Sequence, residues 1–180
     1  MRLIVLDRDG VINEDADAFI KSAAEWVPVP GSMEAIARLT QAGWTVAVAT
    51  NQSGLSRGLY DRVALAQMHL KLQRLVAAAG GRVDWISTAP YQAHEQSPAR
   101  KPGAGMLRAI AWRYGVDLAG VPFVGDTFSD VQAALTVGMQ PVLVRSGKGR
   151  RTLSSHGAEI ERLQVPVYDN LLTAVERLWA

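Results

Sequence analysis

The amino-acid sequence predicts an α/β protein, a Rossmann-like three-layer α/β/α sandwich with a central parallel sheet. Short apolar runs rich in branched residues recur along the chain, and stretches with helical periodicity separate them. Helical connections between strands give right-handed βαβ units, which build a parallel sheet covered by helices on both faces. A chain of 180 residues can bury one substantial core, so we expect a single domain over residues 1–180.

The apolar runs and the turn residues between them define the expected elements. Strands are predicted at residues 3–6, 44–49, 83–88, 121–124 and 141–144. The first helix begins near Ser32, after a Pro-Gly turn, and ends at Gly43, because glycine commonly terminates helices. The second follows Asp61, a suitable N-cap with an apolar stripe behind it, and ends at Gly80. Further helices are expected at about residues 103–114 and just after Asp126.

The composition narrows the class of protein. No apolar run has the length of a transmembrane helix and the N-terminus lacks the pattern of a signal peptide, so we expect a cytoplasmic protein without a membrane partner. The sequence contains no cysteine, which excludes disulfides and thiolate metal sites. The net charge is only +2 and the basic stretch 145–151 is interpreted as a solvated loop, so no nucleic-acid partner is expected. No exposed apolar heptad indicates assembly, and we expect a monomer.

Polar residues follow the predicted strands at one edge of the sheet. Parallel sheets bind ligands beyond the carboxyl ends of their strands, which makes these residues candidates for a functional site. They are Asp7 and Asp9 after the first strand, Thr50, Asn51, Gln52 and Ser53 after the second, Arg100 and Lys101 in the loop after the third, and Asp126 after the fourth. Acids, hydroxyl groups and cations therefore converge on this edge.

This combination of side chains suits hydrolysis of a phosphate ester. Asp7 and Asp126, at neighbouring strand ends, repel each other unless a cation lies between them, and carboxylates with open water positions suit Mg²⁺. Thr50, Lys101 and the backbone amides of residues 51–54 provide donors and positive charge for a tetrahedral dianion. Asp7 is then the candidate nucleophile. Asp9 is the candidate that protonates the leaving oxygen and deprotonates the hydrolytic water.

Other interpretations compete with this one. Asp7 and Asp9 could merely cap a turn, and Asp126 could serve only as a helix N-cap. The functional interpretation is favoured because several such motifs occur together, each at a predicted strand end. A receiver-like signalling domain is the alternative from another class, but its phosphorylated Asp follows the third strand, where this chain has Ser87-Thr88-Ala89.

Four motifs together resemble those of the haloacid dehalogenase (HAD) phosphatase superfamily. They are DRDG at 7–10, TNQSG at 50–54, RKPGAGM at 100–106 and VGDTFSD at 124–130. Within the superfamily, DRDGVIN, TNQSG with SRG, and RKP resemble the D-glycero-D-manno-heptose 1,7-bisphosphate 7-phosphatases, with the histidinol-phosphatases as neighbours. The resemblance implies removal of the C7 phosphate of a sugar bisphosphate, for lipopolysaccharide-core or other heptose-glycan precursor synthesis. Histidinol phosphate or another small phosphate ester is the alternative substrate.

The resemblance also implies a role for each matching residue. Asp7 would be nucleophile and Mg²⁺ ligand, Asp9 would be proton donor and metal ligand through its backbone carbonyl, and Asp126 would be a side-chain ligand. Thr50, Arg100 and Lys101 would position and stabilise the phosphoryl group, and Asp130 would hold Lys101 or a metal-bound water. The implied substrate-binding residues are Asp15, Ala16, Asp17, Ala18, Thr50, Asn51, Gln52, Ser53, Arg100 and Lys101.

The sequence departs from the family pattern at two places. Residues 89–91 and 97–99 read Ala-Pro-Tyr and Ser-Pro-Ala where the family carries zinc-binding Cys and His, so we predict a zinc-free loop rigidified by Pro90, Pro98 and Pro102. Thr127 stands where the family usually has a lysine that contacts substrate. The connections after the first two motifs are too short for a large cap domain. We therefore expect an open site shaped by the loops at 14–27 and 89–100.

Overall fold

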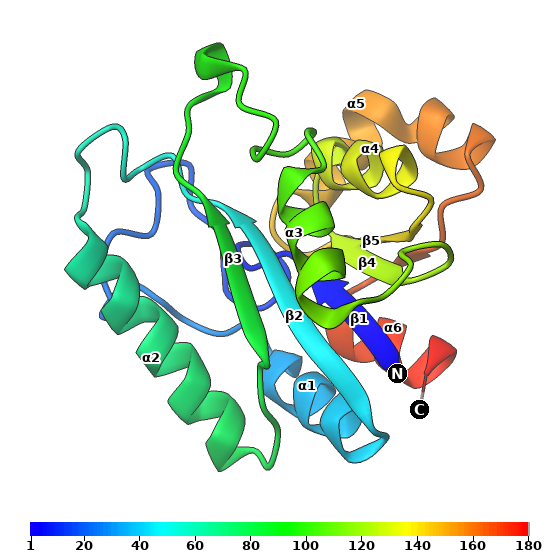
Figure 1. Ribbon diagram of the computed structural model, residues 1–180, viewed down its shortest axis with the longest axis horizontal. Helices are drawn as coiled ribbons and strands as arrows, with labels where there is room; N and C mark the ends of the chain where they lie inside the picture. The colour runs from blue at the N-terminus through cyan, green and yellow to red at the C-terminus, as the bar shows by residue number, and fades with distance from the viewer. Residues whose placement is uncertain (180) are drawn as a thin grey trace.

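The computed structural model describes residues 1–179 and consists of a six-stranded parallel sheet with helices on both faces (Figure 1). The strands are β1 (Arg2–Leu6), β2 (Trp44–Asn51), β3 (Trp85–Ala89), β4 (Pro122–Gly125), β5 (Gln140–Val144) and β6 (Val167–Tyr168). Their order across the sheet is β3-β2-β1-β4-β5-β6, and each neighbouring pair is parallel. This arrangement confirms the predicted three-layer sandwich.

The helices divide between the two faces of the sheet. They are α1 (Ser32–Gln41), α2 (Arg62–Ala78), α3 (Gly105–Tyr114), α4 (Phe128–Thr136), α5 (Gly149–Arg162), α6 (Leu171–Leu178) and the short 3-10 helix η1 (Ala93–Glu95). The helices α1, α2 and α6 bury side chains such as Ile36 and Leu72 in one apolar core with Ile4 and Leu6 of β1. The helices α3 and α4 form the core of the opposite face, and α5 packs beside α4.

Local sequence signals determine where the first two helices begin and end. The side chain of Asp61 accepts a hydrogen bond from the Ala64 amide at 2.8 Å, which is the predicted N-cap of α2. Helix α1 is followed by Gly43, which adopts a left-handed φ of 80° before β2 starts. Both helices therefore occupy the positions expected from the sequence.

The last part of the chain forms structure that the sequence did not predict. Residues 149–151 belong to the first turn of α5, so only the beginning of the basic stretch 145–151 is a loop. Helix α5 buries only Gly149, Thr152 and Ile160, and strand β6 has two residues, so the apolar signal of each is sparse. Strand β3 also begins later than expected, because the Asp84 carboxylate accepts a hydrogen bond from the Val46 amide at 2.8 Å.

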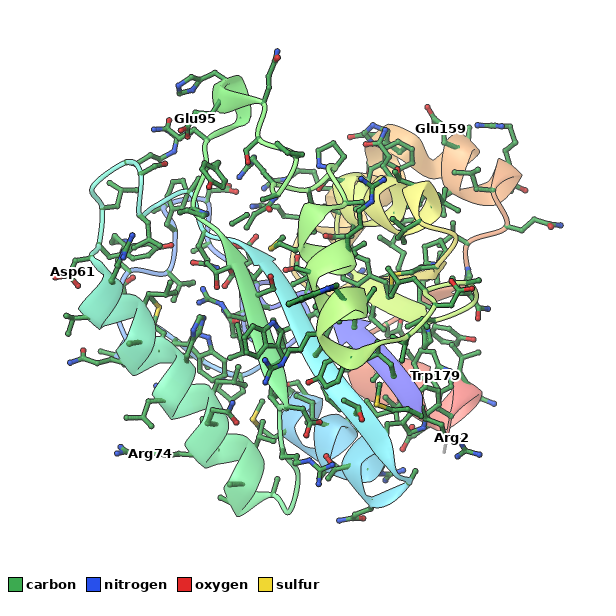
Figure 2. All side chains as sticks on the ribbon, in the orientation of Figure 1. Arg2, Asp61, Arg74, Glu95, Glu159 and Trp179 are labelled. Atoms are coloured by element: carbon green, nitrogen blue, oxygen red, sulfur yellow. The ribbon has the colours of Figure 1, made fainter. Side chains whose placement is uncertain are left out.

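The loops at the carboxyl ends of the strands lie at one end of the molecule. Glu95, at the tip of the loop after β3, lies at this end, whereas Arg2 and Trp179 lie at the other (Figure 2). The connections that follow β1 and β2 hold no helix of their own before α1 and α2. Among residues 1–179, no helix is both long and apolar enough to cross a membrane.

Candidate active site

Asp7 lies directly after β1, at the carboxyl edge of the sheet. Its amide donates a hydrogen bond to the Val124 carbonyl at 2.8 Å, which continues the pairing of β1 with β4 and brings Asp7 next to Asp126. Its Oδ1 atom accepts a hydrogen bond from the Arg8 amide at 2.7 Å and lies 2.8 Å from Lys101 Nζ. Because both contacts use Oδ1, they leave Oδ2 available for an electrophile.

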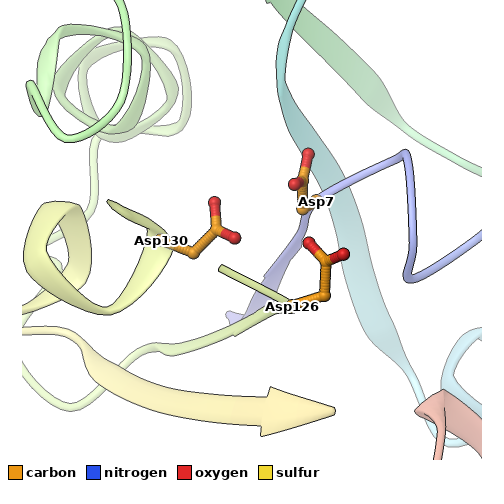
Figure 3. A group of neighbouring side chains, drawn as sticks. All are labelled: Asp7, Asp126 and Asp130. Carbon is orange, nitrogen blue, oxygen red and sulfur yellow. The ribbon is translucent and has the colours of Figure 1, made fainter. Parts of the chain in front are cut away.

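Asp126 and Asp130 join Asp7 in a buried cluster of acids. Asp126 follows β4 and Asp130 lies in the first turn of α4, and the three carboxylates face one another (Figure 3). One oxygen from each lies within 4.8 Å of the others. Burial raises the pKa of Asp7 to about 7, despite the nearby charge of Lys101. Burial and the charge of Asp7 raise the pKa of Asp126 well above its ordinary value.

Two glycines allow the backbone to approach Asp126 closely. Gly10 and Gly147 have φ angles of 86° and 56°, and a Cβ atom at either would lie 2.0 or 2.3 Å from Asp126 Oδ2. The Lys148 amide can therefore donate to that oxygen at 2.7 Å, while the Thr152 hydroxyl donates to the Asp126 carbonyl at 2.8 Å. The other carboxylate oxygen, Oδ1, is buried without a hydrogen-bond partner among the described residues.

Lys101 is the cation inside this acidic cluster. Its Nζ donates to the Ala49 carbonyl at 2.8 Å and lies 2.8 Å from Asp7 and 2.7 Å from Asp130. Burial opposes the charged form, but Asp130 and Asp7 outweigh it and raise the pKa of Lys101. The predicted pairing of Asp130 with Lys101 is therefore present. The remaining Asp130 oxygen accepts hydrogen bonds from the amide and hydroxyl of Thr127, the actual N-cap of α4.

These residues fit a divalent cation. Three ionised carboxylates and one ammonium leave two negative charges in a buried site, which one divalent cation balances. Asp126 Oδ1, which has no hydrogen-bond partner among the described residues, is free to coordinate a cation, and hard carboxylate oxygens suit Mg²⁺. A zinc site of the thiolate type cannot form, since the sequence has no cysteine.

Asp9 is held by hydrogen bonds from three side chains. Arg8, which is fully buried, contacts it through Nε at 3.1 Å and Nη2 at 2.8 Å, and Asn13 Nδ2 donates at 2.8 Å. Gln52 Nε2 donates to Asp9 Oδ2 at 2.7 Å. Burial favours the neutral acid, but the charge of Arg8 and these hydrogen bonds prevail and lower the pKa of Asp9. Asp9 is thus a carboxylate whose orientation is fixed by these hydrogen bonds.

A cavity of about 310 Å³ opens above the acidic cluster. Its lining residues are Asp7, Asp9, Asp15, Ala16, Asp17, Phe19, Asn51, Ser53, Arg57, Arg100, Lys101, Asp126, Thr127, Ser129, Asp130 and Lys148. Most of the residues predicted for the site therefore surround one space. Thr50 and Gln52 are only 1% and 3% exposed and lie outside this lining, as does Ala18.

The loop after Asp9 is fastened to the beginning of α5 by two ion pairs. Lys148 Nζ lies 2.8 Å from Asp15, and Arg151 contacts both oxygens of Asp17 at 3.1 and 3.2 Å. The Ala18 carbonyl, by contrast, accepts a hydrogen bond from Lys21 at 3.1 Å. Asp15 and Asp17 are thus on the cavity wall with their charges already paired.

The loop after β3 is closed by hydrogen bonds. Arg100 Nη1 donates to the Tyr91 carbonyl at 3.0 Å, which joins the two ends of the loop around η1. The Asn51 side chain accepts from the Lys101 amide at 3.0 Å and donates to the Lys101 carbonyl at 3.1 Å. These contacts hold Arg100 and Lys101 where the cavity meets the sheet.

Comparison with known proteins agrees with this geometry. A HAD-hydrolase-like family model matches residues 98–174. A D-glycero-beta-D-manno-heptose-1,7-bisphosphate 7-phosphatase of Pseudomonas putida is 59% identical over 153 residues, which cover 85% of this chain and 87% of that protein. The chain belongs to the D-glycero-beta-D-manno-heptose-1,7-bisphosphate 7-phosphatase family. The family member of Bordetella bronchiseptica is 56% identical over 157 residues, covering 87% of this chain and 88% of that protein.

Solved structures of this heptose bisphosphate phosphatase family have the same fold. The D,D-heptose 1,7-bisphosphate phosphatase of B. bronchiseptica, complexed with magnesium and phosphate, matches with a TM-score of 0.94 and 52% identity, covering 99% of this chain and 98% of that one. The corresponding enzyme of Burkholderia thailandensis gives a TM-score of 0.74 and 42% identity over the whole of both chains. The HAD resemblance seen in the four motifs is therefore confirmed, and the receiver-like alternative is excluded.

Sequence reasoning missed several residues that build the site. Arg8, between the two catalytic candidates, is fully buried and is the principal partner of Asp9. The only signal in the sequence was a basic residue between two acids. Lys148 was assigned to a solvated loop, yet its amide orients Asp126 and its ammonium group pairs with Asp15. Neither backbone contact nor long-range pairing is visible in the sequence.

Proposed function

We propose that this protein is a Mg²⁺-dependent phosphomonoesterase that removes the C7 phosphate of D-glycero-D-manno-heptose 1,7-bisphosphate and leaves heptose 1-phosphate. The observation that carries the proposal is the buried arrangement of Asp7, Asp126 and Lys101 beneath a cavity that Asp9 also lines. The family to which the chain belongs supports the sugar substrate. The product would serve heptose-glycan precursor synthesis, such as that of the lipopolysaccharide core.

Asp7 is the nucleophile in this proposal. Its Oδ2 attacks phosphorus and forms an aspartyl phosphate while the bond between phosphorus and the C7 oxygen of the sugar breaks. Lys101 and the Arg8 amide hold Oδ1, so the attacking oxygen is oriented before substrate arrives. Thr50, whose hydroxyl accepts a hydrogen bond from Gln52 at 2.9 Å, retains its own proton for donation to a phosphoryl oxygen.

Asp9 is the acid and base. In the first step it gives a proton to the departing sugar oxygen, and in the second it takes a proton from the water that attacks the aspartyl phosphate. Inorganic phosphate then leaves and Asp7 is regenerated. The negative charge of a bound phosphoryl group raises the pKa of a nearby carboxyl group, which favours the protonated acid that the first step needs.

The magnesium ion would be held by the side chains of Asp7 and Asp126 and by the backbone carbonyl of Asp9. When bound, it neutralises negative charge on the carboxylates and the phosphoryl group. Asp130 has both oxygens engaged with Lys101 and Thr127, so it positions the lysine instead of coordinating the ion.

The cavity wall supports a substrate with more than one phosphate. Arg57 and Arg100 both line the cavity. Burial and the charge of Arg57 lower the pKa of Arg100, as expected for two cations on the wall of one cavity. A second anionic group on the substrate would relieve this repulsion. Arg100, Asn51 and Ser53 are accordingly proposed as substrate contacts, together with Asp15, Ala16 and Asp17.

The protein is further proposed to act as a cytoplasmic monomer with residues 1–180 as a single domain. All six strands belong to one sheet and are distributed between residues 2 and 168, which supports a single folding unit. Light scattering of the purified protein tests the monomer, and limited proteolysis tests whether the chain is cut into separate folded parts.

Phosphate release from a panel of esters tests the proposed reaction. The panel holds both anomers of D-glycero-D-manno-heptose 1,7-bisphosphate, histidinol phosphate, fructose 1,6-bisphosphate and a 3′-phosphorylated oligonucleotide, each with Mg²⁺ and with EDTA. We expect a heptose bisphosphate to exceed the others in kcat/KM by orders of magnitude and EDTA to abolish release. Preference for histidinol phosphate, or equal rates on every ester, would contradict the assignment.

A further inference from the structure

The carboxamide of Gln52 connects Asp9 to a buried tyrosine. Its Nε2 donates to Asp9 Oδ2 at 2.7 Å and to the Thr50 hydroxyl at 2.9 Å. Its Oε1 accepts a hydrogen bond from the Tyr60 hydroxyl at 2.5 Å. All polar atoms of this carboxamide are therefore engaged inside the protein, and the residue is only 3% exposed.

The orientation of this carboxamide is determined by its neighbours. An ionised carboxylate only accepts hydrogen bonds, so the NH₂ end of Gln52 must face Asp9 and the carbonyl end must face Tyr60. The Tyr60 hydroxyl suits the carbonyl end of Gln52 because it can donate a hydrogen bond to it. Gly54 leaves room for this tyrosine, since a Cβ atom there would lie 2.2 Å from the Tyr60 ring.

Gln52 is the partner that holds Asp9 from a different segment of the chain. Arg8 and Asn13 belong to the same segment as Asp9, whereas Gln52 extends from the end of β2. It thus ties Asp9, which lies beyond the end of β1, to a neighbouring strand of the sheet. A carboxyl group held from two separate segments has less freedom to rotate than one held from its own loop.

We propose that Gln52, oriented by Tyr60, is a positioning residue that acts on the reaction through Asp9 and makes no contact with substrate. This inference rests on the proposed function, because it requires Asp9 to be the acid and base. It differs from the substrate-binding role that family resemblance implies for Gln52. Gln52 lies outside the cavity lining, as does Thr50, but the two residues differ in what they can offer a substrate. The Thr50 hydroxyl keeps a proton to donate, whereas both polar atoms of the Gln52 carboxamide are already engaged inside the protein, which supports the distinction.

The inference predicts a specific pattern of kinetics. Loss of the Gln52 donor should lower kcat for heptose bisphosphate and leave KM unchanged, since the substrate loses no contact. The loss should depend on the leaving group. A sugar oxygen needs a proton from Asp9 as it departs, whereas p-nitrophenolate leaves without one. For p-nitrophenyl phosphate, kcat/KM reports the formation of the aspartyl phosphate. This kcat/KM should therefore hardly change when the Gln52 donor is lost.

The test compares Gln52→Met, Asp9→Asn and the double variant on both esters. Methionine has a similar shape and no donor. Gln73→Met is the matched control, because Gln73 lies on α2 and donates a single hydrogen bond to the Val83 carbonyl. We expect Gln52→Met to lower kcat/KM roughly 10- to 100-fold for heptose bisphosphate and about twofold for p-nitrophenyl phosphate. In the Asp9→Asn background the same substitution should change neither rate by more than about twofold.

Each outcome decides between the alternatives. A raised KM, equal losses on both esters, or losses that multiply with those of Asp9→Asn would overturn the inference and assign Gln52 to substrate binding. If Asp9→Asn itself retains normal turnover of heptose bisphosphate, the proposed function of Asp9 fails instead. Should Gln52→Met not fold, Gln52→Glu replaces it, and Tyr60→Phe must give a smaller loss with the same ester dependence.

Discussion

The Nζ atom of Lys101 lies 2.8 Å from Oδ1 of Asp7, and both residues are less than a tenth exposed. The same ammonium group pairs with Asp130, so one buried cation balances two acids. This arrangement explains how Asp7 and Asp130 can lie within a few ångströms of each other in a buried site. The negative charge of the buried carboxylates would therefore be neutralised partly by the lysine and partly by a metal ion when one is bound.

Replacement of Lys101 by methionine should damage both stability and catalysis. Removing one partner of a buried ion pair costs about 3–5 kcal/mol, since the acids lose their counter-charge. We expect the free energy of unfolding without metal to fall by about that amount and kcat for heptose bisphosphate to fall at least about 100-fold. Thermal denaturation and phosphate release measure the two effects. Arg108→Met, at an exposed cation on α3, is the control and should change neither.

Asp126→Asn should separate the stability of the metal-free protein from its response to magnesium. The substitution removes one negative charge from the buried cluster, so the metal-free variant should unfold at a higher temperature than the metal-free parent. Saturating Mg²⁺, which would stabilise the parent by about 3 kcal/mol at a hundred times its Kd, should leave the variant unchanged. An equal rise in Tm for both proteins on adding Mg²⁺ would show that Asp126 is not a ligand.

His69 should make the folded state sensitive to mild acid. Burial, aided by Arg8 at 3.4 Å and opposed by Asp9, lowers the pKa of His69 to about 4. Between pH 6.5 and about 4 the unfolded chain therefore binds a proton that the folded protein does not, and stability decreases as pH falls. Asp7 has a raised pKa and acts in the opposite direction, so the comparison must be made with a variant.

His69→Gln keeps an acceptor for Arg8 and removes the titration. Relative to this variant, the parent should lose roughly 2–3 kcal/mol of unfolding free energy on going from pH 7 to pH 4. Chemical denaturation of both proteins at intervals across this range measures the difference. Parallel pH profiles would mean that His69 is not held in its neutral form.

Arg100→Ala should weaken substrate binding more than turnover. The guanidinium group lines the cavity and closes the loop after β3 through the Tyr91 carbonyl. Its loss should raise KM for heptose bisphosphate about tenfold with a smaller change in kcat, because Asp7 and Asp9 are untouched. Arg108→Ala, on the exposed side of α3, is the control. A fall confined to kcat would move Arg100 from substrate binding to stabilisation of the transferred phosphoryl group.

Much of the fold and the approximate position of the site follow from the sequence because both depend on local patterns. Apolar runs indicated the first five strands, and parallel sheets bring the residues after their strands to one edge, where Asp7 and Asp126 do meet. Helix α5 and strand β6 escaped prediction since α5 is largely polar and β6 has two residues. Helix α6 was missed although its buried residues Leu171, Ala174 and Val175 recur at helical spacing. Their positions depend on contacts with the rest of the sheet.

The finer structure of the site depends on contacts between distant residues. Thr127 is the N-cap of α4 through its capping box with Asp130, whereas the sequence offered Asp126 for that position. Gln52 appeared to be a substrate residue because it lies in the motif TNQSG, yet its neighbours Asn51 and Ser53 line the cavity in its place. Alternation along an extended segment sends successive side chains in different directions, and only the fold determines which ones reach the ligand.

The most direct test of the central claim is ³¹P NMR of D-glycero-D-manno-heptose 1,7-bisphosphate during turnover with Mg²⁺. We expect the C7 resonance to disappear, inorganic phosphate to appear in equal amount and the C1 resonance to persist. Neither EDTA-treated protein nor Asp7→Asn should produce any change. Loss of the C1 phosphate, or normal turnover by Asp7→Asn, would contradict the account of a magnesium-dependent 7-phosphatase that uses Asp7 as its nucleophile.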